Sequence, residues 1–403
     1  MDASRRKTLK NIALGLLAGG GMPHLSSRLD AGPLPGEPAS QSIFPTARSI
    51  VEGPRSQVVT GLEWLGEQIP CPQPDRRGDT FPLTWAADDA IYTSAGDPVW
   101  PDKNKSGLDV ERILGNPPDF HIDRVNEMAD FKGWGGEGPK PSGLISVKGT
   151  LYLAFQNLTG KGDQTRDNPD IVANYGHGYD AQIVASSDFG KTWKPDIKAI
   201  SKPMFPGRTF GAPAFVNFGK DNLGAWDKFV YAISGEGWDD GSHCRLGRVP
   251  ADSIMDRASW EWVSALSSKG DPQWSKDMNL AVPVITHPGY LGMVDMVYIS
   301  SLRRYLLLGW RNKVKCDPDA GSELIVYDAP EPWGPFTIVY HEDPWESVEL
   351  NPYNPRLPLK WFDHEKLEGW LLFSGSWRSG GQTPTYRVHV RKFRLKTRRE
   401  PGR

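Results

Sequence analysis

Residues 78–97 read GDTFPLTWAADDAIYTSAGD, and this stretch decides the predicted fold. Aromatic and β-branched residues fill its two arms, so we expect strands at residues 80–86 and 90–96 with a tight acidic turn between them. In the hairpin so formed, Asp79 lies opposite Asp97. Cross-strand neighbours have Cβ atoms about 4.5–5.5 Å apart, and like charges placed there destabilise a sheet. Two carboxylates at the open end of one hairpin therefore need a reason.

Three explanations for the pair stay open at this point. Asp79 and Asp97 are catalytic; or the register shifts by one residue and the two side chains never meet; or each aspartate caps a turn through its own backbone.

The composition favours a turn-rich β protein. The 403 residues include 43 Gly, 35 Pro and 16 Trp; Gly and Pro break helices, and Trp fills sheet cores or stacks on sugar-like ligands. A net charge of −2 provides no basic surface for nucleic acid, so no nucleic-acid partner is predicted. Cys71, Cys244 and Cys316 are too widely spaced for a local metal site, and their odd number leaves at least one thiol unpaired. No cofactor motif stands in a supporting context, so we predict neither a cofactor nor a metal.

The N-terminus is predicted to direct export. In residues 1–25, the pair Arg5-Arg6 precedes an apolar run at residues 12–18 that is too short to span a bilayer, which takes about 20 residues. This pattern resembles a twin-arginine signal, with an ordinary basic signal as the alternative. Either predicts a periplasmic or secreted protein with no stable membrane insertion. Residues 26–48, rich in Pro, Ala, Gly and Ser, are expected to be a disordered linker.

A recurring pair of strands predicts one repeat domain at residues 49–398, followed by a tail at residues 399–403. Helix-like patterns at residues 108–114 and 250–257 are short. After the first hairpin, further two-strand units are expected at residues 140–157, 211–237, 293–310 and 354–375. Each unit is followed by candidate outer strands. For the first unit, residues 106–126 are expected to supply the outer strands. Five such units predict an all-β, five-bladed β-propeller, closed by residues 58–69 against the last blade. A β-sandwich or two β domains is the alternative.

Residues 186–193, SSDFGKTW, support the propeller directly. They fit the S-x-D-x-G-x-T-W pattern called the Asp box, and resemble the turn between outer strands in sialidases and other propeller glycosidases. Asp188 can accept backbone N–H groups within the turn, Gly190 can adopt a positive φ, and Trp193 can pack beneath the blade. The motif is structural, so Asp188 is not a candidate catalytic residue.

Candidate binding residues lie at the ends of the innermost hairpins, because propeller sites are built at one end of the central axis. Tryptophan faces stack on sugar rings, and acids and amides hold hydroxyl groups, so this set suits a polysaccharide or oligosaccharide. The candidate substrate-binding residues are Trp134, Arg208, Trp238, Asp239, Asp295, Trp310, Tyr353, Asn354 and Trp377.

Four segments together resemble a known family. Residues 78–97, RVPADSIMDRASWEW, YDAPEPWGPFTIVYH and the pair YNPRLPLKWF and GWLLFSG are similar to secreted bacterial and phage propellers long catalogued only as a domain of unknown function. Some members are endo-D-arabinanases that form their own glycoside hydrolase family. The resemblance implies a five-bladed propeller that hydrolyses furanoside links, as in D-arabinan, with acidic residues. The two acids of the family's opening block match Asp79 and Asp97 here.

The spacing of two carboxyl groups also predicts a mechanism. A separation of about 5–5.5 Å favours a retaining route through a covalent intermediate, and roughly 6.5–9.5 Å favours inversion through a water. Across a hairpin the shorter distance is expected, and repulsion should raise one of the two pKa values. We expect Asp79 to be the nucleophile or base and Asp97 the acid, with reversed roles as the alternative. Glu236 is a third catalytic candidate, because a middle-blade Glu is often the acid in other five-bladed glycosidases.

Other functions stay open. One is a lectin-like, carbohydrate-binding propeller without catalysis. Another is a sialidase-like exo-glycosidase, which should carry several Asp boxes, three clustered arginines and a Tyr–Glu pair. A lactonase-like propeller holding Ca²⁺ through Asp and Asn oxygens is a weaker candidate. In each case we expect a monomer.

Overall fold

The structure is a computed structural model that describes residues 51–100, 106–133, 138–158, 178–237, 241–314 and 317–398. All of these residues lie in the second of the two units into which the chain divides, Arg48–Arg403. The predicted export signal, linker and tail lie outside the described residues.

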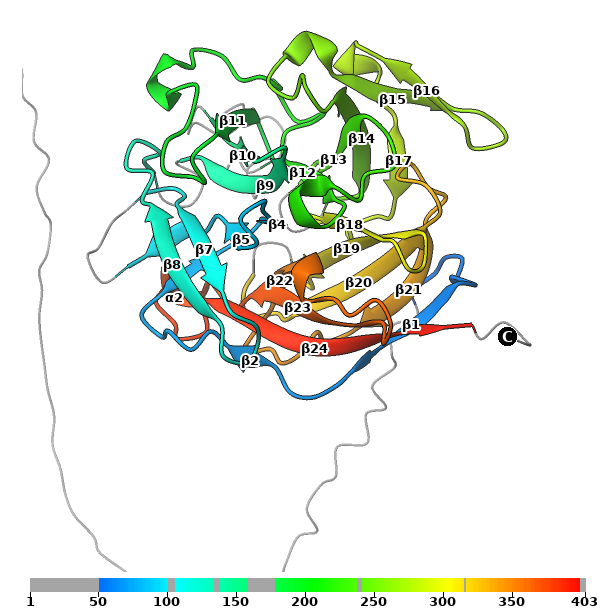
Figure 1. The fold of residues 1–403 in the computed structure, drawn as a ribbon. Coiled ribbons are helices and arrows are strands. Elements are labelled where there is room, and N and C mark those ends of the chain that lie inside the picture. The colour runs from blue at the N-terminus through cyan, green and yellow to red at the C-terminus, as the bar shows by residue number, and fades with distance from the viewer. Residues whose placement is uncertain are drawn as a thin grey trace, which may run out of the picture. The chain divides into compact units, whose positions relative to one another are not determined.

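Strands make up nearly all of the regular structure, as predicted. Among the described elements, the helical ones are short 3-10 turns and the four-residue helix α2 (Arg378–Gly381), so the fold is all-β (Figure 1). None of the described helices has the length and apolar character that crossing a membrane requires.

The quoted stretch begins the first antiparallel group of strands. Its strands are β4 (Leu83–Trp85), β5 (Ile91–Thr93), β7 (Val110–Leu114) and β8 (His121–Asn126), paired in that order. Leu83 lies opposite Thr93 and Trp85 opposite Ile91, so the predicted hairpin about the acidic turn is confirmed. At the tip, the side chain of Asp88 accepts the N–H of Ala90 and stabilises the turn.

The following groups repeat this arrangement along the chain. The second contains β9 (Lys140–Val147), β10 (Thr150–Gln156) and β11 (Gln182–Ser186). The third contains β12 (Pro213–Asn217), β13 (Phe229–Gly235), β14 (His243–Pro250) and β15 (Glu261–Leu266), with β16 (Pro272–Ser275) and β17 (Pro283–Thr286) added to it. The fourth contains β18 (Asp295–Ile299), β19 (Arg304–Asn312), β20 (Ser322–Ala329) and β21 (Thr337–Glu342). In the β9–β10 turn, Lys148 and Gly149 both have positive φ, as a two-residue hairpin of the right twist requires.

The last group joins the two ends of the described chain. It contains β22 (Tyr353–Arg356), β23 (Glu368–Ser374), β24 (Val388–Thr397), β1 (Val59–Trp64) and β2 (Ile69–Pro70). β1 pairs with β24, with Leu62 beside Leu395 and Trp64 beside Phe393. The predicted closure of the first strand against the last is confirmed.

The first strands of the groups are neighbours. β12 pairs in parallel with β18 through Val216–Met296 and Asn217–Val297. β9 contacts both β4 and β12, and β22 contacts β18. Figure 1 shows these strands in the middle of the unit. Residues at the beginnings of hairpins that are far apart in sequence are therefore brought together.

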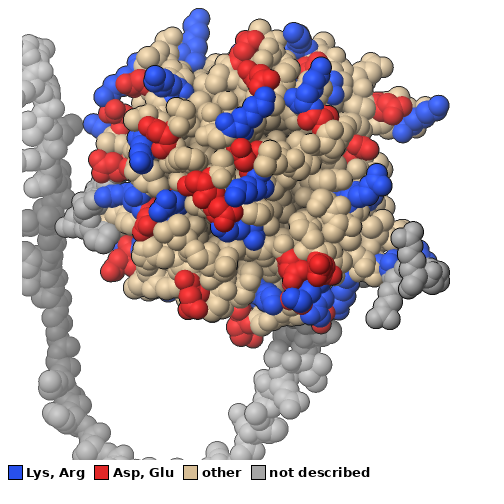
Figure 2. Space-filling model, viewed as in Figure 1, with Lys and Arg blue, Asp and Glu red and all other residues tan. Residues whose placement is uncertain are grey.

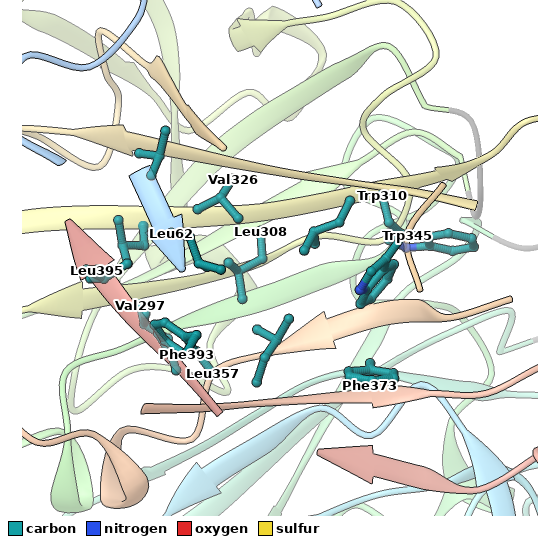
Figure 3. Close-up of a cluster of buried hydrophobic side chains, with 14 of the residues drawn as sticks. Leu62, Val297, Leu308, Trp310, Val326, Trp345, Leu357, Phe373, Phe393 and Leu395 are labelled. Atoms are coloured by element: carbon teal, nitrogen blue, oxygen red, sulfur yellow. The ribbon is translucent and has the colours of Figure 1, made fainter. Parts of the chain in front are cut away.

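Apolar side chains between the groups form the core. In Figure 3, Leu62 of β1, Leu308 of β19 and Phe393 of β24 lie in one cluster, together with Trp310 and Trp345. Burying one large apolar side chain contributes roughly 1.5–3 kcal/mol, so clusters of this kind hold neighbouring groups together.

Three local expectations are wrong. Residues 108–114 are not helical, since Val110–Leu114 is a strand whose Val110 and Ile113 pack into the core; together with His121–Asn126 it confirms that residues 106–126 supply the outer strands of the first unit. Residues 250–257 form turns that lead into a 3-10 turn at Arg257–Ser259, capped by the side chain of Asp256. The fifth hairpin's first strand ends at Arg356, and Leu359–Trp361 is a 3-10 turn that follows Pro358, which cannot donate to a sheet ladder.

Candidate functional site

The two acids of the quoted stretch lie on a second, offset pair of strands. β3 (Arg77–Asp79) pairs with β6 (Gly96–Val99), and Asp79 lies opposite Gly96 rather than Asp97. The hairpin register shifts by one residue because Thr80 and Phe81 adopt left-handed backbone conformations, with φ of 64° and 42°. The expectation that Asp79 directly faces Asp97 in the sheet is therefore wrong.

Gly96 leaves room for the carboxyl group of Asp79. A Cβ atom at residue 96 would collide with Oδ1 of Asp79 and lie 3.2 Å from Oγ1 of Thr80. A side chain at residue 96 would therefore displace the carboxyl group of Asp79 or the strand.

Despite the offset, the two carboxyl groups act on each other. Asp79 is buried, and burial raises its pKa to about 8, with a further upward contribution from the charge of Asp97. Hydrogen bonds from Tyr353 and Tyr386 act in the opposite direction; the hydroxyl of Tyr353 donates to Oδ2 of Asp79 at 3.0 Å. Asp79 therefore favours its protonated form at neutral pH. One pKa of the pair is raised, as expected, but burial contributes more to this than the repulsion between the two acids on which the expectation rested.

Asp97 has a different kind of partner. The Nζ atom of Lys140 lies 3.1 Å from Oδ1 of Asp97, and the lysine side chain is almost fully buried. A neighbouring cation favours the ionised form of a carboxyl group. The contacts of the pair are thus unsymmetrical, because tyrosine hydroxyls bond to Asp79 and the ammonium group lies against Asp97. The charge of Lys140 also acts on Asp79, where it lowers the pKa.

Arg356 ties the segment after Asp79 to the neighbouring group of strands. Its Nε donates to the carbonyl of Thr80 and its Nη1 to the carbonyl of Val294, each at 3.0 Å. Its Nη1 also lies 3.7 Å from Oδ1 of Asp295, whose Oδ2 accepts the N–H of Leu357 at 3.2 Å. Asp295, a candidate for substrate binding, is thus engaged within the protein through both carboxylate oxygens.

The candidate aromatic residues differ in exposure. Trp310 is fully buried in the cluster of Figure 3, and its Nε1 donates to the carbonyl of Met293. Tyr353 is also fully buried, against Asp79. Trp377 is partly exposed and packs edge-on against Tyr353, with ring centroids 5.1 Å apart. Among the described candidates, Trp377 is therefore an aromatic side chain that has exposed surface and contacts Tyr353, the hydrogen-bond partner of Asp79.

Asn354 follows Tyr353 on β22 and is fully buried with a φ of 51°. Among the described residues, neither amide atom of Asn354 has a hydrogen-bond partner. The side-chain amide of Asn354 is adjacent in sequence to Tyr353, the hydrogen-bond partner of Asp79. The amide itself makes no described hydrogen bond that would position either acid.

Glu236 and Arg208 belong to the third group of strands. Glu236 accepts the N–H of Ser242 at 3.3 Å, and its Oε2 lies 3.7 Å from Arg245. Arg208 lies over the ring of Tyr179 at 5.9 Å. Neither is among the groups that shift the pKa of Asp79. Trp134, Trp238 and Asp239 lie outside the described residues.

Two partners of the acids were missed by the sequence reasoning. Lys140 is the first residue of the second predicted unit, and a lysine that opens an inner strand was a usable signal. Tyr386 comes from the turn before β24, where the sequence offered no signal.

The SSDFGKTW turn is held by its own side chains. Asp188 accepts the N–H of Thr192 at 2.9 Å and its hydroxyl at 2.7 Å. Gly190 has a φ of 90°, and Trp193 donates to its carbonyl at 2.9 Å. These are the contacts expected from the residues, and they are local to the turn.

No metal centre stands out in the part of the chain that the structure describes, because no group of three or more His, Cys, Asp or Glu side chains is placed to hold an ion there. On the face drawn in Figure 2, acidic and basic side chains are interspersed, and neither sign covers a broad area.

Comparisons with known proteins connect this chain to one family. A family described as a domain of unknown function (DUF4185) matches residues 78–337, which include both acids. No match is found among curated proteins.

Solved structures give only distant likenesses. An alpha-L-arabinofuranosidase from Podospora anserina, in complex with cellotriose, is 12% identical with a TM-score of 0.49, covering 84% of this chain and 98% of its own. A GH43_1 enzyme from Xanthomonas citri, complexed with xylotriose, is 15% identical with a TM-score of 0.46, covering 81% and 89%. A protein of unknown function from Dyadobacter fermentans is 10% identical with a TM-score of 0.46, covering 83% and 100%. At these values the likenesses say nothing about activity.

Proposed function

We propose that this chain, which belongs to the family described as a domain of unknown function (DUF4185), is a glycoside hydrolase acting on a furanoside polysaccharide. The observation that carries the proposal is the unsymmetrical carboxyl pair: a buried Asp79 that keeps its proton, beside an Asp97 ion-paired with Lys140. A protonated and an ionised carboxyl group acting together are what glycoside hydrolysis requires. The resemblance of residues 78–97 to endo-D-arabinanases makes a D-arabinan-like polymer the first substrate to test.

The groups of strands correspond to the blades of a five-bladed propeller at residues 49–398. Support comes from contacts between the strands that begin successive groups: β4 with β9, β9 with β12, β12 with β18, and β18 with β22. Further support comes from β1, which completes the last group by pairing with β24. In this arrangement, the SSDFGKTW turn is an Asp box on an outer edge.

In the proposed reaction, Asp79 donates its proton to the glycosidic oxygen as the bond to the anomeric carbon breaks. Asp97 either forms a bond to that carbon or takes a proton from the attacking water. These roles reverse the first expectation from the sequence, because the raised pKa belongs to Asp79 and the cation lies beside Asp97. Proton NMR of the first-formed product distinguishes retention, through a covalent intermediate, from inversion.

The test measures product release from D-arabinan, L-arabinan, fructan, xylan and sialylated glycans. Wild type, Asp79→Asn, Asp97→Asn and a control, Asp75→Asn at an exposed position, are compared. We expect oligosaccharides from one furanoside polymer, a loss of about 10²–10⁴-fold for Asp79→Asn, since that is the usual contribution of general acid catalysis, and no loss for the control. Near-normal turnover by Asp79→Asn or Asp97→Asn would remove that residue from the scheme.

A second candidate is a carbohydrate-binding propeller without catalysis. It is favoured by the low exposure of the acids, since Asp79 and Asp97 are each 7% exposed. Retained glycan binding, with no product from any polymer and no change on Asp79→Asn, would support it.

Export remains part of the proposal, through the twin-arginine pattern in residues 1–25. Fractionation of a bacterial host should find the protein in the periplasm or medium, and replacement of Arg5 and Arg6 by lysine should keep it in the cytoplasm. A cytoplasmic wild type would contradict this assignment.

A further inference from the structure

Lys140 is a buried lysine whose ammonium group contacts four acceptors among the described residues. Its side chain is 2% exposed, and Nζ lies 3.2, 3.5 and 3.3 Å from the carbonyl oxygens of Gly133, Gly138 and Pro139. The Oδ1 atom of Asp97 lies 3.1 Å from the same Nζ atom. Removing an ammonium ion from water is unfavourable unless such partners compensate it, so these carbonyl groups stabilise the charge in this position.

The same backbone junction fixes Asp97. The N–H of Asp97 donates to the carbonyl of Gly107 at 3.1 Å, and the N–H of Gly107 donates to Phe131 at 2.5 Å. A Cβ atom at Gly107 would lie 2.6 Å from the carbonyl oxygen of Pro139 and 2.9 Å from that of Gly133. The carbonyl groups of Pro139 and Gly133 also accept from Lys140. Glycine at residue 107 therefore lets the backbone that binds Asp97 pack closely against the backbone that binds Lys140.

We propose that Lys140 is a positioning residue, which keeps Asp97 ionised so that Asp79 and Asp97 take different roles in the reaction. The inference rests on the proposed function for what the two acids do in the reaction. The effect of Lys140 on the ionisation of Asp97 can be measured without a substrate. Among the described residues, the titratable groups that act on Asp97 include the carboxyl of Asp79, the hydroxyls of Tyr353 and Tyr386, and the ammonium of Lys140.

Removing the cation has a defined consequence. A carboxylate that loses an adjacent positive charge binds its proton more tightly, so the pKa of Asp97 should rise when Lys140 becomes neutral. Two neighbouring carboxyls would then compete for one proton and titrate as a pair, and neither would be committed to one role.

The first experiment is a pH titration of Asp ¹³Cγ resonances in the full chain, with the two site signals assigned from Asp79→Asn and Asp97→Asn. Lys140→Gln removes the charge and keeps a donor for the carbonyls; Lys140→Met removes both, and Lys140→Arg keeps the charge. We expect the Asp97 midpoint to rise by about 1–3 pH units in the Gln and Met variants, and to stay within about half a unit of wild type in Lys140→Arg. An unchanged midpoint in folded Lys140→Gln would overturn the inference.

The second experiment measures kcat/KM against pH on the polymer that the panel identifies. In Lys140→Gln, the acid limb of the profile should move upward with the Asp97 midpoint, while a purely structural role would lower the rate equally at every pH. Loss of turnover in both Asp variants with a wild-type profile in Lys140→Gln would reject Lys140 and leave the hydrolase standing. A shifted Asp97 midpoint with no turnover by wild type would instead reject the hydrolase and keep the charge role of Lys140.

Discussion

The raised pKa that suits Asp79 to act as an acid also makes the folded protein less stable at high pH. The pKa of Asp79 is about 8 in the folded protein, mainly because the residue is buried, against about 4 in an unfolded chain. The folded state therefore binds this proton more tightly, and the resulting stability is fully present below about pH 4 and is lost as pH rises toward 8.

Replacing Asp79 by Asn should therefore stabilise the protein at high pH. At pH 8 we expect a free energy of unfolding at least about 1 kcal/mol above wild type, the equivalent of one pKa unit, with the difference disappearing near pH 4. Thermal midpoints at pH 4, 6 and 8 measure it, with Asp75→Asn at an exposed position as the matched control. A variant less stable than wild type at pH 8 would show that Asp79 is ionised in the folded protein.

Tyr353 tunes the same proton. Its hydroxyl donates to Asp79 and so favours the ionised form; removing the hydroxyl in Tyr353→Phe should raise the pKa of Asp79 further. With Asp79 as the acid, the alkaline limb of kcat/KM should move upward by about one pH unit, the size expected for a hydrogen bond to a charged group. Tyr92→Phe, which removes a hydroxyl bonded to Asp88 at the other end of the hairpin, should leave the limb unchanged. A downward shift in Tyr353→Phe would contradict this role.

The sequence identified the acids but not what distinguishes them. Both acids belong to one stretch with a local pattern, whereas Tyr353 lies 274 residues from Asp79 and Lys140 belongs to the next group of strands. Trp310 shows the opposite error, because its residue type suits a sugar site but its place on β19 puts it in the apolar cluster. Residue type alone does not separate the two environments.

At the scale of elements, turns were predicted better than registers. The β4–β5 and β9–β10 hairpins follow from their turn residues, but the β3–β6 offset depends on Thr80 and Phe81, neither of which favours a left-handed conformation. The residue before a proline is ordinarily extended, so the left-handed conformation of Phe81 before Pro82 also departs from the local preference. Arg356 of β22 donates to the carbonyl of Thr80 and so stabilises this backbone conformation. The sequence around Thr80 contains no sign of this distant partner.

The β3–β6 pair should not tolerate a side chain at Gly96. In Gly96→Ala, the new methyl group collides with Oδ1 of Asp79, and either the carboxyl group or the strand has to move. We expect turnover to fall at least about tenfold, since displacement of a reacting group by about 1 Å can cost a hundredfold. Gly61→Ala in β1, whose nearest neighbours would lie 3.9 Å away, is the control. Wild-type turnover in Gly96→Ala would show that the position of Asp79 does not matter.

At the scale of the molecule, the repeat and its closure were predicted because each unit has the same two-strand pattern. What could not be predicted is how the units meet, since the contacts between β9, β12 and β18 depend on packing of side chains from separate groups. The acids take Lys140 from β9 and Tyr353 from β22, so the candidate site exists only when the groups are assembled.

The pairing of β1 with β24 should contribute to the stability of the protein but not to catalysis. Leu62 is 8% exposed and packs in the cluster of Figure 3, beside Leu395 of β24. Leu62→Ala should lower the free energy of unfolding by about 2–4 kcal/mol, the usual cost of such a truncation in a core. Val58→Ala, just before β1 and 39% exposed, should change it by less than about 0.5 kcal/mol.

Turnover per folded molecule at 25 °C should be the same in Leu62→Ala as in wild type. The acids are held by Lys140, Tyr353 and Arg356, none of which contacts the closing strand through a described hydrogen bond or ion pair. Chemical denaturation measures the stability, and kcat at low denaturant measures the site. A parallel fall in kcat, with the variant fully folded, would mean that closure of the last group positions the acids directly, and the separation between a stabilising joint and a catalytic centre would have to be abandoned.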